Sequence, residues 1–520
     1  MIFLTGFMGS GKTTVGLDLA RRMGVPFVDL DTIIAQRSGR SIPEIFRCAG
    51  EQAFRSLEDS VLRDLAADGD PSSVVATGGG LPVNPLNRRL MKACGCIVFL
   101  KASFESLKDR VTGDGSRPLW NSDARGLMQA RTPAYEDADL VVNTDGRSPE
   151  EISREILKAL PGLPDPVGVP LPDNPYPIHV GKGIFSNILS LLRRHVHPEG
   201  LFVMIDENVM KHHSRKVEEA LQGCPACFVT VPPGEGSKSM DFLNTVLDAM
   251  FSCRVNRQWV CMAVGGGVTG DLAGFAASIY MRGIPVVQAA TTLLAQVDSA
   301  IGGKTAVNHS YGKNLVGTFH QPLMVVSDVD FLATLDETEI RSAMSEVIKY
   351  GIIMDAPLFH YLEKGRPYDY VKLVRMCARD KARVVALDER EGGLRRTLNF
   401  GHTLGHALEK SSGYTLPHGL AVAVGMAFAS RLSHDRGLLP SDDLKRIMDL
   451  MARENILPQG LALPPAEEVA EALALDKKGS DRGIHFVLTP STGGVSVQKL
   501  SEIEVLEAYR GFADGYSKSL

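Results

Sequence analysis

The sequence is poor in cysteine, in tryptophan and in net charge for a chain of 520 residues. Its eight cysteines are too few and too scattered for a disulfide scaffold, so reduced thiols are expected. Cys224 and Cys227 have CxxC spacing, but without a second such pair a structural zinc site is not expected. A net charge of −5 gives no general affinity for nucleic acid or anionic membranes.

Long hydrophobic runs are also missing. The N-terminus has no basic start and no long apolar core, so no signal peptide is expected. Gly413, Pro417 and His418 interrupt the longest uncharged stretch, residues 411–430, which makes it a poor membrane span. Hydrophobic residues at 44% and charged residues at 22% exclude a disordered or collagen-like chain. We expect a cytoplasmic globular protein of about two to four domains.

Proline is concentrated in one segment. Seven prolines fall between residues 161 and 177, a density that opposes helix and sheet and favours extended polyproline II. We therefore predict an interdomain linker over residues 161–177. The predicted domains are residues 1–160, 178–335 and 336–520, the last two being parts of one larger half.

Short apolar runs alternate with helical segments on both sides of this linker, which predicts an α/β fold with parallel sheets. The predicted strands are residues 2–4, 74–76 and 97–100 before the linker, and 201–205, 227–231, 259–264 and 285–289 after it. A capped helix is expected over residues 103–110. From about Thr338 the pattern is mainly helical. The sequence thus predicts a P-loop domain, an α/β subdomain and an all-helical subdomain.

Glycine is enriched, with 51 residues in 520, and its clusters indicate ligand sites. Residues 6–13, GFMGSGKT, fit the Walker A pattern between a predicted strand and a helix. In such a loop the backbone N–H groups surround phosphate oxygens. Lys12 would bridge the β- and γ-phosphates of a nucleotide, and the Thr13 hydroxyl would bind Mg²⁺.

Charged residues that could complete this site follow. Asp29 and Asp31 end an apolar run, and alternate residues of a strand share a face. One carboxylate could hold magnesium through water while the other orients or deprotonates an acceptor hydroxyl. Arg55, Arg117 and Arg131 are candidate anion binders. The alternative for each is a solvated surface position.

These features together resemble shikimate kinase over about residues 1–160. The resemblance also includes residues 41–46, 50–58, 78–80 and 117–119, and Arg131 ahead of Tyr135. It implies phosphorylation of the shikimate 3-hydroxyl with ATP and Mg²⁺. It implies ATP contacts from Gly9, Ser10, Gly11, Lys12, Thr13 and Thr14, shikimate contacts from Asp31, Arg55, Gly79 and Arg131, and catalytic roles for Lys12, Asp31 and Arg117, the last from a lid. Trp120 stands where the family usually has leucine.

A second glycine cluster, residues 265–271, follows a predicted strand. There it suits close backbone approach to a dinucleotide pyrophosphate, although the spacing is not GxGxxG. Farther on, His402 and His406 are four residues apart on one helix face, and spacing alone nominates them as a metal-ligand pair. His418, twelve residues beyond His406, and Glu346 are further residues of the metal-ligand type. Two histidines and one glutamate would form a three-ligand zinc site of the catalytic kind. Hydrogen-bonded structural histidines are the alternative.

A group of basic residues indicates a third candidate site. Arg282, Lys304, Lys313 and Lys349 stand among small and apolar residues. An unpaired charge in such a setting is costly unless it meets an anion, which indicates an anion pocket. Scattered surface lysines are the alternative.

Here the resemblance is to 3-dehydroquinate synthase, over about residues 176–500. Its carriers include residues 233–238, 265–271, 291–298, 302–304, 313–314, 346–349 and 398–409. It implies a cyclisation of 3-deoxy-arabino-heptulosonate 7-phosphate that uses NAD and Zn²⁺ or Co²⁺. The metal would be bound by Glu346, His402 and His418, with His406 beside it. NAD would contact Asp206, Asn208, Glu235, Lys238, Gly266, Gly267, Asp271, Thr291 and Thr292.

The same resemblance implies the remaining roles. Substrate would meet Arg282, Lys304, Lys313, Asn314, Lys349 and Asn399, and the catalytic group would be Lys304, Lys349, His406, Lys381 and Arg395. We therefore predict a bifunctional shikimate-pathway enzyme, with a homodimer formed through the second half and with no nucleic-acid or membrane partner. The alternatives are a related sugar-phosphate cyclase or polyol dehydrogenase fused to the kinase, or one half acting as a silent scaffold.

Overall fold

The computed structural model describes residues 1–111, 119–120, 123–413, 415–458, 460–475 and 484–519. The chain divides into two compact units. Unit 1 contains residues 1–179 and 190–197, and unit 2 contains residues 180–189 and 198–520.

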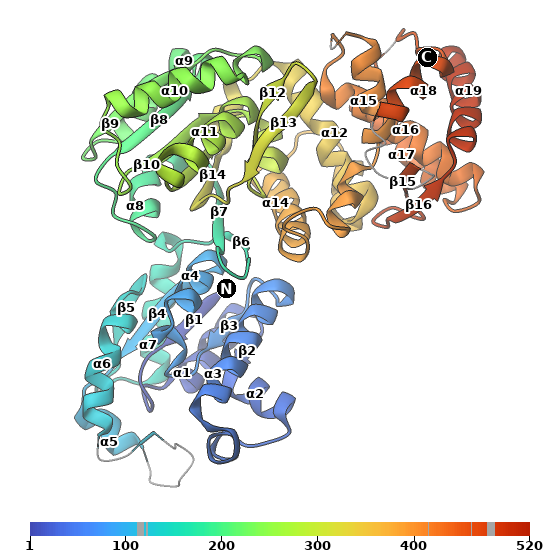
Figure 1. The fold of residues 1–520 in the computed structure, drawn as a ribbon. Helices are drawn as coiled ribbons and strands as arrows, with labels where there is room; N and C mark the ends of the chain where they lie inside the picture. The colour runs from blue at the N-terminus through green and yellow to red at the C-terminus, as the bar shows by residue number, and fades with distance from the viewer. Residues whose placement is uncertain (112–118, 121–122, 414, 459, 476–483, 520) are drawn as a thin grey trace. The chain divides into compact units, whose positions relative to one another are not determined.

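Unit 1 is built on a five-stranded parallel sheet in the order β2-β3-β1-β4-β5 (Figure 1). Its strands are β1 (Ile2–Thr5), β2 (Phe27–Asp29), β3 (Val74–Ala76), β4 (Cys96–Lys101) and β5 (Leu140–Asn143). Short apolar runs form these strands because helices bury both faces of the sheet. The predicted strands at 2–4, 74–76 and 97–100 are confirmed as β1, β3 and β4.

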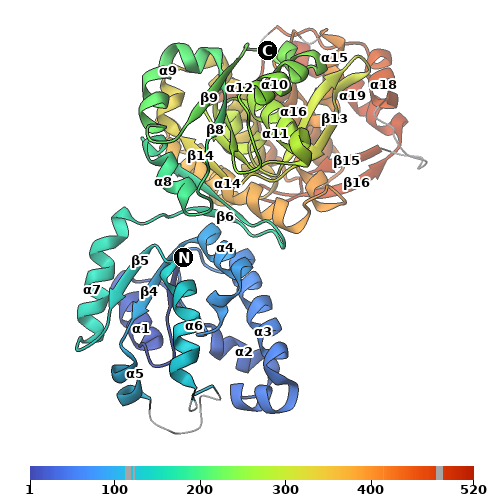
Figure 2. The same ribbon diagram turned by 60° about the vertical axis from the view of Figure 1, so that its left-hand side comes forward.

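Alternate side chains of β1 enter two different cores. Ile2 and Leu4 pack with α1 (Lys12–Met23) and α7 (Pro149–Ala159). Phe3 packs with α2 (Leu30–Ser38), α3 (Ile42–Asp68) and α4 (Pro85–Cys94) on the other face. Figure 2 shows α7 and α3 on opposite sides of this unit. The remaining helices are α5 (Phe104–Arg110), capped by Ser103 as predicted, and α6 (Ala124–Glu136).

The proline-rich segment contains regular structure. A short 3₁₀ turn covers Leu160–Gly162, and β6 (Val167–Val169) pairs antiparallel with β7 (Tyr176–Gly181). The expectation that this segment avoids sheet is therefore wrong. Prolines flank β6 but do not interrupt it, so its backbone N–H groups remain available for pairing.

Unit 2 begins with an α/β region in which parallel strands follow the order β14-β11-β10-β8-β9. These are β8 (Leu201–Asp206), β9 (Ala226–Val231), β10 (Val260–Gly265), β11 (Val286–Ala290) and β14 (Met324–Asp328), so the four predicted strands are confirmed. Phe202 and Met204 pack against α10 (Met240–Ser252) and α11 (Gly267–Ile279). The region also contains α9 (Glu207–Ala220) and a hairpin of β12 (Lys304–His309) and β13 (Gly312–Phe319). The short helix α8 (Ile188–Arg193) contains residues of both units.

The rest of unit 2 is helical, as predicted. Its helices are α12 (Glu337–Ile353), α13 (Ala356–Glu363), α14 (Tyr370–Leu387), α15 (His402–Ser411), α16 (His418–Asp435), α17 (Ser441–Arg453), α18 (Ala466–Leu475) and α19 (Glu502–Ser519). One element was not predicted: β15 (Ile484–Leu488) and β16 (Ser496–Leu500) form an antiparallel pair. The prediction of an all-helical subdomain is therefore wrong for these two strands.

The cysteine prediction needs correction. Cys227 in β9 and Cys253 after α10 form a disulfide with their Cα atoms 6.5 Å apart. The packing of α10 against the sheet brings together two residues separated by 26 positions, a proximity that cysteine spacing cannot reveal. Cys48, Cys94, Cys96, Cys261 and Cys377 are free thiols.

The helices of the described ranges were compared with the length and hydropathy that a membrane span requires. None of them is both long enough and apolar enough to cross a bilayer.

The contact between α15 and α16 depends on glycine. A Cβ atom added at Gly425 would lie 1.9 Å from the carbonyl oxygen of Gly401. We expect Gly425→Ala to force the helices apart and to lower the free energy of unfolding of unit 2 by about 1–3 kcal/mol, measured by thermal unfolding. Gly511→Ala in α19 is the matched control, because its added Cβ meets no atom within 4 Å. Equal destabilisation by both variants would contradict the account.

Candidate active sites

The phosphate loop of unit 1 follows β1 and leads into α1. Gly6, Gly9 and Gly11 have φ values of 142°, 83° and 92°, a region that favours glycine. The Nζ atom of Lys12 donates to the carbonyl oxygens of Gly6 at 2.9 Å and Phe7 at 3.1 Å. The loop therefore holds its lysine over the space into which the first N–H groups of α1 point, an arrangement suited to nucleotide phosphates.

Asp29 and Asp31 lie beside this loop, but not for the predicted reason. The strand β2 ends at Asp29, and Asp31 lies in the first turn of α2, so the two do not share a strand face. They approach because Asp29 caps the helix: its Oδ1 accepts the Asp31 N–H at 3.1 Å. Its Oδ2 accepts the Thr13 hydroxyl at 2.8 Å, which couples the carboxylate to the predicted magnesium ligand.

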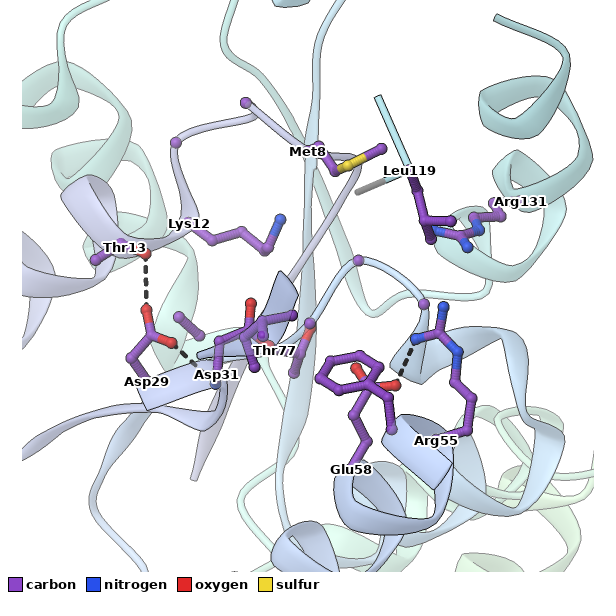
Figure 3. Close-up of a pocket in the computed structure, with 18 of the residues that line it drawn as sticks. Met8, Lys12, Thr13, Asp29, Asp31, Arg55, Glu58, Thr77, Leu119 and Arg131 are labelled. Carbon is purple, nitrogen blue, oxygen red and sulfur yellow. Dashed lines mark hydrogen bonds and ion pairs between the residues drawn. The ribbon is translucent and has the colours of Figure 1, made fainter. Parts of the chain in front are cut away.

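Both aspartates line a cavity of about 450 Å³ (Figure 3). Predicted site residues that line it are Gly9, Gly11, Lys12, Thr13, Thr14, Asp31, Arg55, Gly79 and Arg131. Ser10 is buried. The predicted lid residue Arg117 lies outside the described residues. The cavity thus brings the predicted phosphate loop and the predicted acceptor-binding residues to one space.

Glu58 is a residue of this cavity to which the sequence analysis gave no role. It is 1% exposed and forms an ion pair with Arg55, the residue three positions earlier on α3 (Figure 3). Burial raises the pKa of Glu58 to about 7, although Arg55 opposes the shift. Burial also raises the pKa of Asp31, with a further contribution from Asp29. The i, i+3 spacing of Arg55 and Glu58 could have indicated the pair.

The predicted NAD residues of unit 2 lie where parallel strands end. Asp206 ends β8, Gly265 ends β10, and Thr291 follows β11, and these three strands are neighbours in the sheet. The carboxyl ends of parallel strands are the usual place for a dinucleotide. A Cβ atom at Gly266 would lie 2.9 Å from Thr292, and one at Gly267 would lie 3.0 Å from Ser299. Only glycine leaves this edge open, which fits close approach of a pyrophosphate.

Polar contacts tie this edge together. Lys238 is buried, and its Nζ donates to Asp271 at 2.7 Å and also to Asn314. Glu235 accepts from the side chain of Asn308 at 2.8 Å. Burial raises the pKa of Asp271 to about 6 against the opposing charge of Lys238. The N–H groups of Asn208 and Val209 bind the carboxylate of Asp206.

Three helices bring one metal-type group together. Glu346 of α12, His402 of α15 and His418 of α16 have ligand atoms that all lie within 4.8 Å of one another. Burial and the charge of Lys349 hold the pKa of His402 well below its usual value, so its imidazole is neutral, as a metal ligand must be. The carboxylate of Glu346 is buried; Lys349 forms an ion pair with its Oε2, and Nε2 of His402 lies 3.4 Å from its Oε1. Two imidazoles and a carboxylate suit zinc.

The nomination of His402 with His406 by spacing alone is not supported. A second group with ligand atoms within 4.8 Å contains His406, Glu409 and His418. Over the described ranges, neither group contains both His402 and His406. His406 nevertheless lies beside the first group, with its ring centroid 5.5 Å from that of His402.

The lysines of the predicted anion pocket are not unpaired charges, so that argument for them is wrong. Each contacts a carboxylate: Lys304 with Glu391 at 2.6 Å, Lys313 with Glu409 at 3.5 Å, Lys349 with Glu346, and Lys381 with Asp298 at 2.8 Å. Sequence distance hid these partners, since three of the four pairs are more than 80 positions apart. The pocket is a charge-balanced network.

Other predicted residues differ in exposure. Arg282 and Asn399 are exposed, and Arg282 has a positive φ of 67°. Arg395 is 2% exposed and donates to the carbonyl oxygens of Gly302 and Glu389. Tyr350, which the sequence analysis did not single out, donates its hydroxyl proton to Asp298.

Sequence families match both units. The shikimate kinase family model matches residues 8–161. Models of the N-terminal and C-terminal parts of 3-dehydroquinate synthase match residues 228–342 and 343–479. The 3-dehydroquinate synthase of Geobacter metallireducens is 42% identical over 350 residues, which cover 65% of this chain and 97% of that protein. That of Caldanaerobacter subterraneus subsp. tengcongensis is 40% identical over 356 residues, with 66% and 100% covered.

Solved structures agree on the fold of the larger unit. A 2-epi-5-epi-valiolone synthase from Streptomyces hygroscopicus subsp. jinggangensis, solved with NAD⁺ and Zn²⁺ bound, aligns with a TM-score of 0.60 at 29% identity. The alignment covers 65% of this chain and 97% of that structure. A 2-deoxy-scyllo-inosose synthase has the same TM-score of 0.60 at 24% identity and shares the fold. Both resemblances inferred from sequence are thus confirmed, and the chain belongs to the 3-dehydroquinate synthase family, with a shikimate kinase domain preceding the synthase.

Proposed function

We propose that the chain catalyses two reactions at two separate sites. The kinase site transfers the γ-phosphoryl group of ATP to the 3-hydroxyl of shikimate. The synthase site converts 3-deoxy-arabino-heptulosonate 7-phosphate to 3-dehydroquinate with release of phosphate. The observation that carries the synthase assignment is the convergence of Glu346, His402 and His418 from three helices beside a network of lysines.

In the kinase site, residues of the cavity position both substrates. ATP with Mg²⁺ supplies the phosphoryl group and neutralises part of its charge. Lys12 binds the phosphates, Thr13 contributes to the magnesium site, and Arg55, Gly79 and Arg131 hold shikimate. Asp31 accepts the hydroxyl proton, a role that a cavity carboxylate with a raised pKa performs well. Glu58 fixes Arg55 at the acceptor side of the cavity.

In the synthase site, the chain would hold NAD along the carboxyl ends of β8, β10 and β11. NAD and zinc supply transient oxidation of one hydroxyl and polarisation of the neighbouring oxygens. Glu346, His402 and His418 hold the metal. Lys304, Lys313, Lys349, Lys381, Arg395 and Asn399 orient the substrate anions, with Arg282 and Asn314 beside them, and His406 holds or moves a proton near the metal ligands.

A related sugar-phosphate cyclase is the second candidate for unit 2, since a valiolone synthase shares its fold. The relatives with higher identity, 40–42%, are named 3-dehydroquinate synthase, which favours the first assignment. A silent scaffold is disfavoured because Lys12, Asp31, Glu346 and the metal histidines are all present.

We also propose three broader properties. The predicted boundaries, with a linker at residues 161–177, separate the kinase from the synthase. The synthase half forms a homodimer, and the protein acts in the cytoplasm. The Cys227–Cys253 disulfide does not support a reducing compartment, and finding it in protein isolated from cells would count against this location.

Independence of the two sites can be measured with one variant. Lys12→Ala should reduce shikimate phosphorylation at least about 100-fold, because the phosphates lose their positive partner. Phosphate release from the heptulosonate phosphate should stay near wild type in the same preparation. Loss of both activities would overturn the proposal of separate sites.

Metal removal should act on one site only. After treatment with a chelator, desalting and restoration of Mg²⁺, we expect kinase turnover to be normal and cyclisation to be lost. Addition of Zn²⁺ or Co²⁺ should restore cyclisation in the wild type but not in His402→Ala. Full cyclisation by metal-free protein would refute the metal assignment.

The buried Glu58 carboxyl predicts a pH-dependent stability. Its pKa is raised from 4.5 to about 7 in the folded chain. The stabilisation that protonated Glu58 gives to the folded state is therefore complete below pH 4.5 and is lost as the pH rises to about 7. The loss amounts to about 3 kcal/mol. In calorimetry, Glu58→Gln should therefore make the free energy of unfolding of unit 1 less dependent on pH between pH 4.5 and 7. Glu51→Gln, which removes an exposed carboxylate that contacts the same Arg55, should leave the slope unchanged.

A further inference from the structure

Glu409 on α15 contacts both the metal-type group and the lysine network of unit 2. It is 6% exposed, which is unusual for a carboxylate. Its Oε2 lies 2.9 Å from Nδ1 of His418, and its Oε1 lies 3.5 Å from Nζ of Lys313. The two oxygens of one carboxylate thus contact two different parts of the site.

The contact with His418 decides which ring nitrogen can bind a metal. When Nδ1 carries the proton and donates to Glu409, Nε2 keeps its lone pair and is the ligand atom. Carboxylates that accept the second N–H of a ligating histidine fix its tautomer and its ring orientation. His418 opens α16 and lies on a different helix from His402, so its ring needs such a constraint to meet the other ligands.

We propose that Glu409 is a positioning residue of the synthase site. It holds His418 with Nε2 directed to Glu346 and His402, and its second oxygen sets the place of Lys313. This inference rests on the proposed function, in which Glu346, His402 and His418 are the metal ligands.

The structure distinguishes this role from that of a ligand. Glu409 also belongs to the second group of close ligand atoms, with His406 and His418. Its two oxygens, however, already face a histidine nitrogen and an ammonium group. The oxygens of Glu346 face a different pair of groups: Oε1 lies 3.4 Å from Nε2 of His402, a member of the same metal-type group, and Oε2 forms an ion pair with Lys349. Because Nδ1 of His418 faces Glu409, its Nε2 is the nitrogen left to bind a metal. This favours the group that contains Glu346 over the group in which Glu409 would itself be a ligand.

Metal affinity gives the direct test. Metal-free full-length protein is titrated with Zn²⁺ in competition with a chromophoric chelator. Glu409→Gln keeps the size of the side chain but removes its charge, and we expect Zn²⁺ to bind 10–100-fold more weakly. The matched control is Asp435→Asn, which alters an exposed carboxylate 3.1 Å from Nδ1 of His434 near the other end of α16. The control should bind Zn²⁺ like the wild type.

Two further readouts separate positioning from loss of structure. Nitrogen NMR of the imidazoles should show His418 protonated at Nδ1 in the wild type and in a mixture of tautomers in Glu409→Gln. The thermal unfolding transition of unit 2 in the metal-free variant should match that of the metal-free wild type, which verifies that unit 2 stays folded.

The outcomes are separable from those of the proposed function. If Glu409→Gln binds Zn²⁺ as tightly as the wild type, the positioning role is refuted while the ligand set stands. If Glu346→Gln retains tight binding and Glu409→Gln abolishes it, Glu409 is itself a ligand and both assignments fail. A wild type that binds no Zn²⁺ would also overturn both.

Discussion

Pairing of opposite charges inside the helical part of unit 2 is the constraint on which the synthase site depends. Lys349 and Glu346 are each 2% exposed and lie one turn apart on α12. Lys381 reaches from α14 to Asp298, which also accepts a hydrogen bond from the buried Tyr350. A buried charge without a partner is costly, so each member of these pairs fixes the position of the other. The lysines keep Asp298 ionised, with its pKa well below the usual range despite burial.

This network places the proposed metal ligands and the proposed anion-binding lysines in one region of unit 2. Carboxylates and imidazoles gather on α12, α15 and α16, and two ammonium groups contact them: Lys349 of α12 with Glu346, and Lys313 of β13 with Glu409. Glu409 joins the two sets, since it contacts His418 and Lys313. Unit 1 contains one such pair, in which the positive charge of Arg55 partly opposes the rise in the pKa of Glu58 that burial causes. Both units therefore position their reactive groups by charge as well as by packing.

The fold was predictable where burial determines local pattern. Fully buried parallel strands such as β1 and β10 are short apolar runs between helices, and the sequence analysis located them within a residue or two. The hairpin of β15 and β16 was missed because its strands are partly exposed and follow a long helical stretch. The strand β6 was missed because proline counts describe a whole segment, whereas pairing depends on individual N–H groups.

The sites were predictable where a motif carries the chemistry along the chain. The phosphate loop and Asp31 are examples, although Asp31 proved to lie on a helix rather than a strand. Partners that meet only in three dimensions were not predictable: Cys227 with Cys253, Lys381 with Asp298, and Glu409 with His418. Helical spacing favoured His402 with His406, whereas the close group includes a histidine from the next helix.

The central claim is that three residues from three helices form one metal site inside this network. Anomalous diffraction at the zinc edge, from crystals grown with Zn²⁺ and NAD⁺, tests it most directly. The account predicts a single peak in unit 2 at about 2.0–2.2 Å from Glu346, His402 and His418. A peak bound instead by His406, Glu409 and His418, or no peak in unit 2, would contradict it.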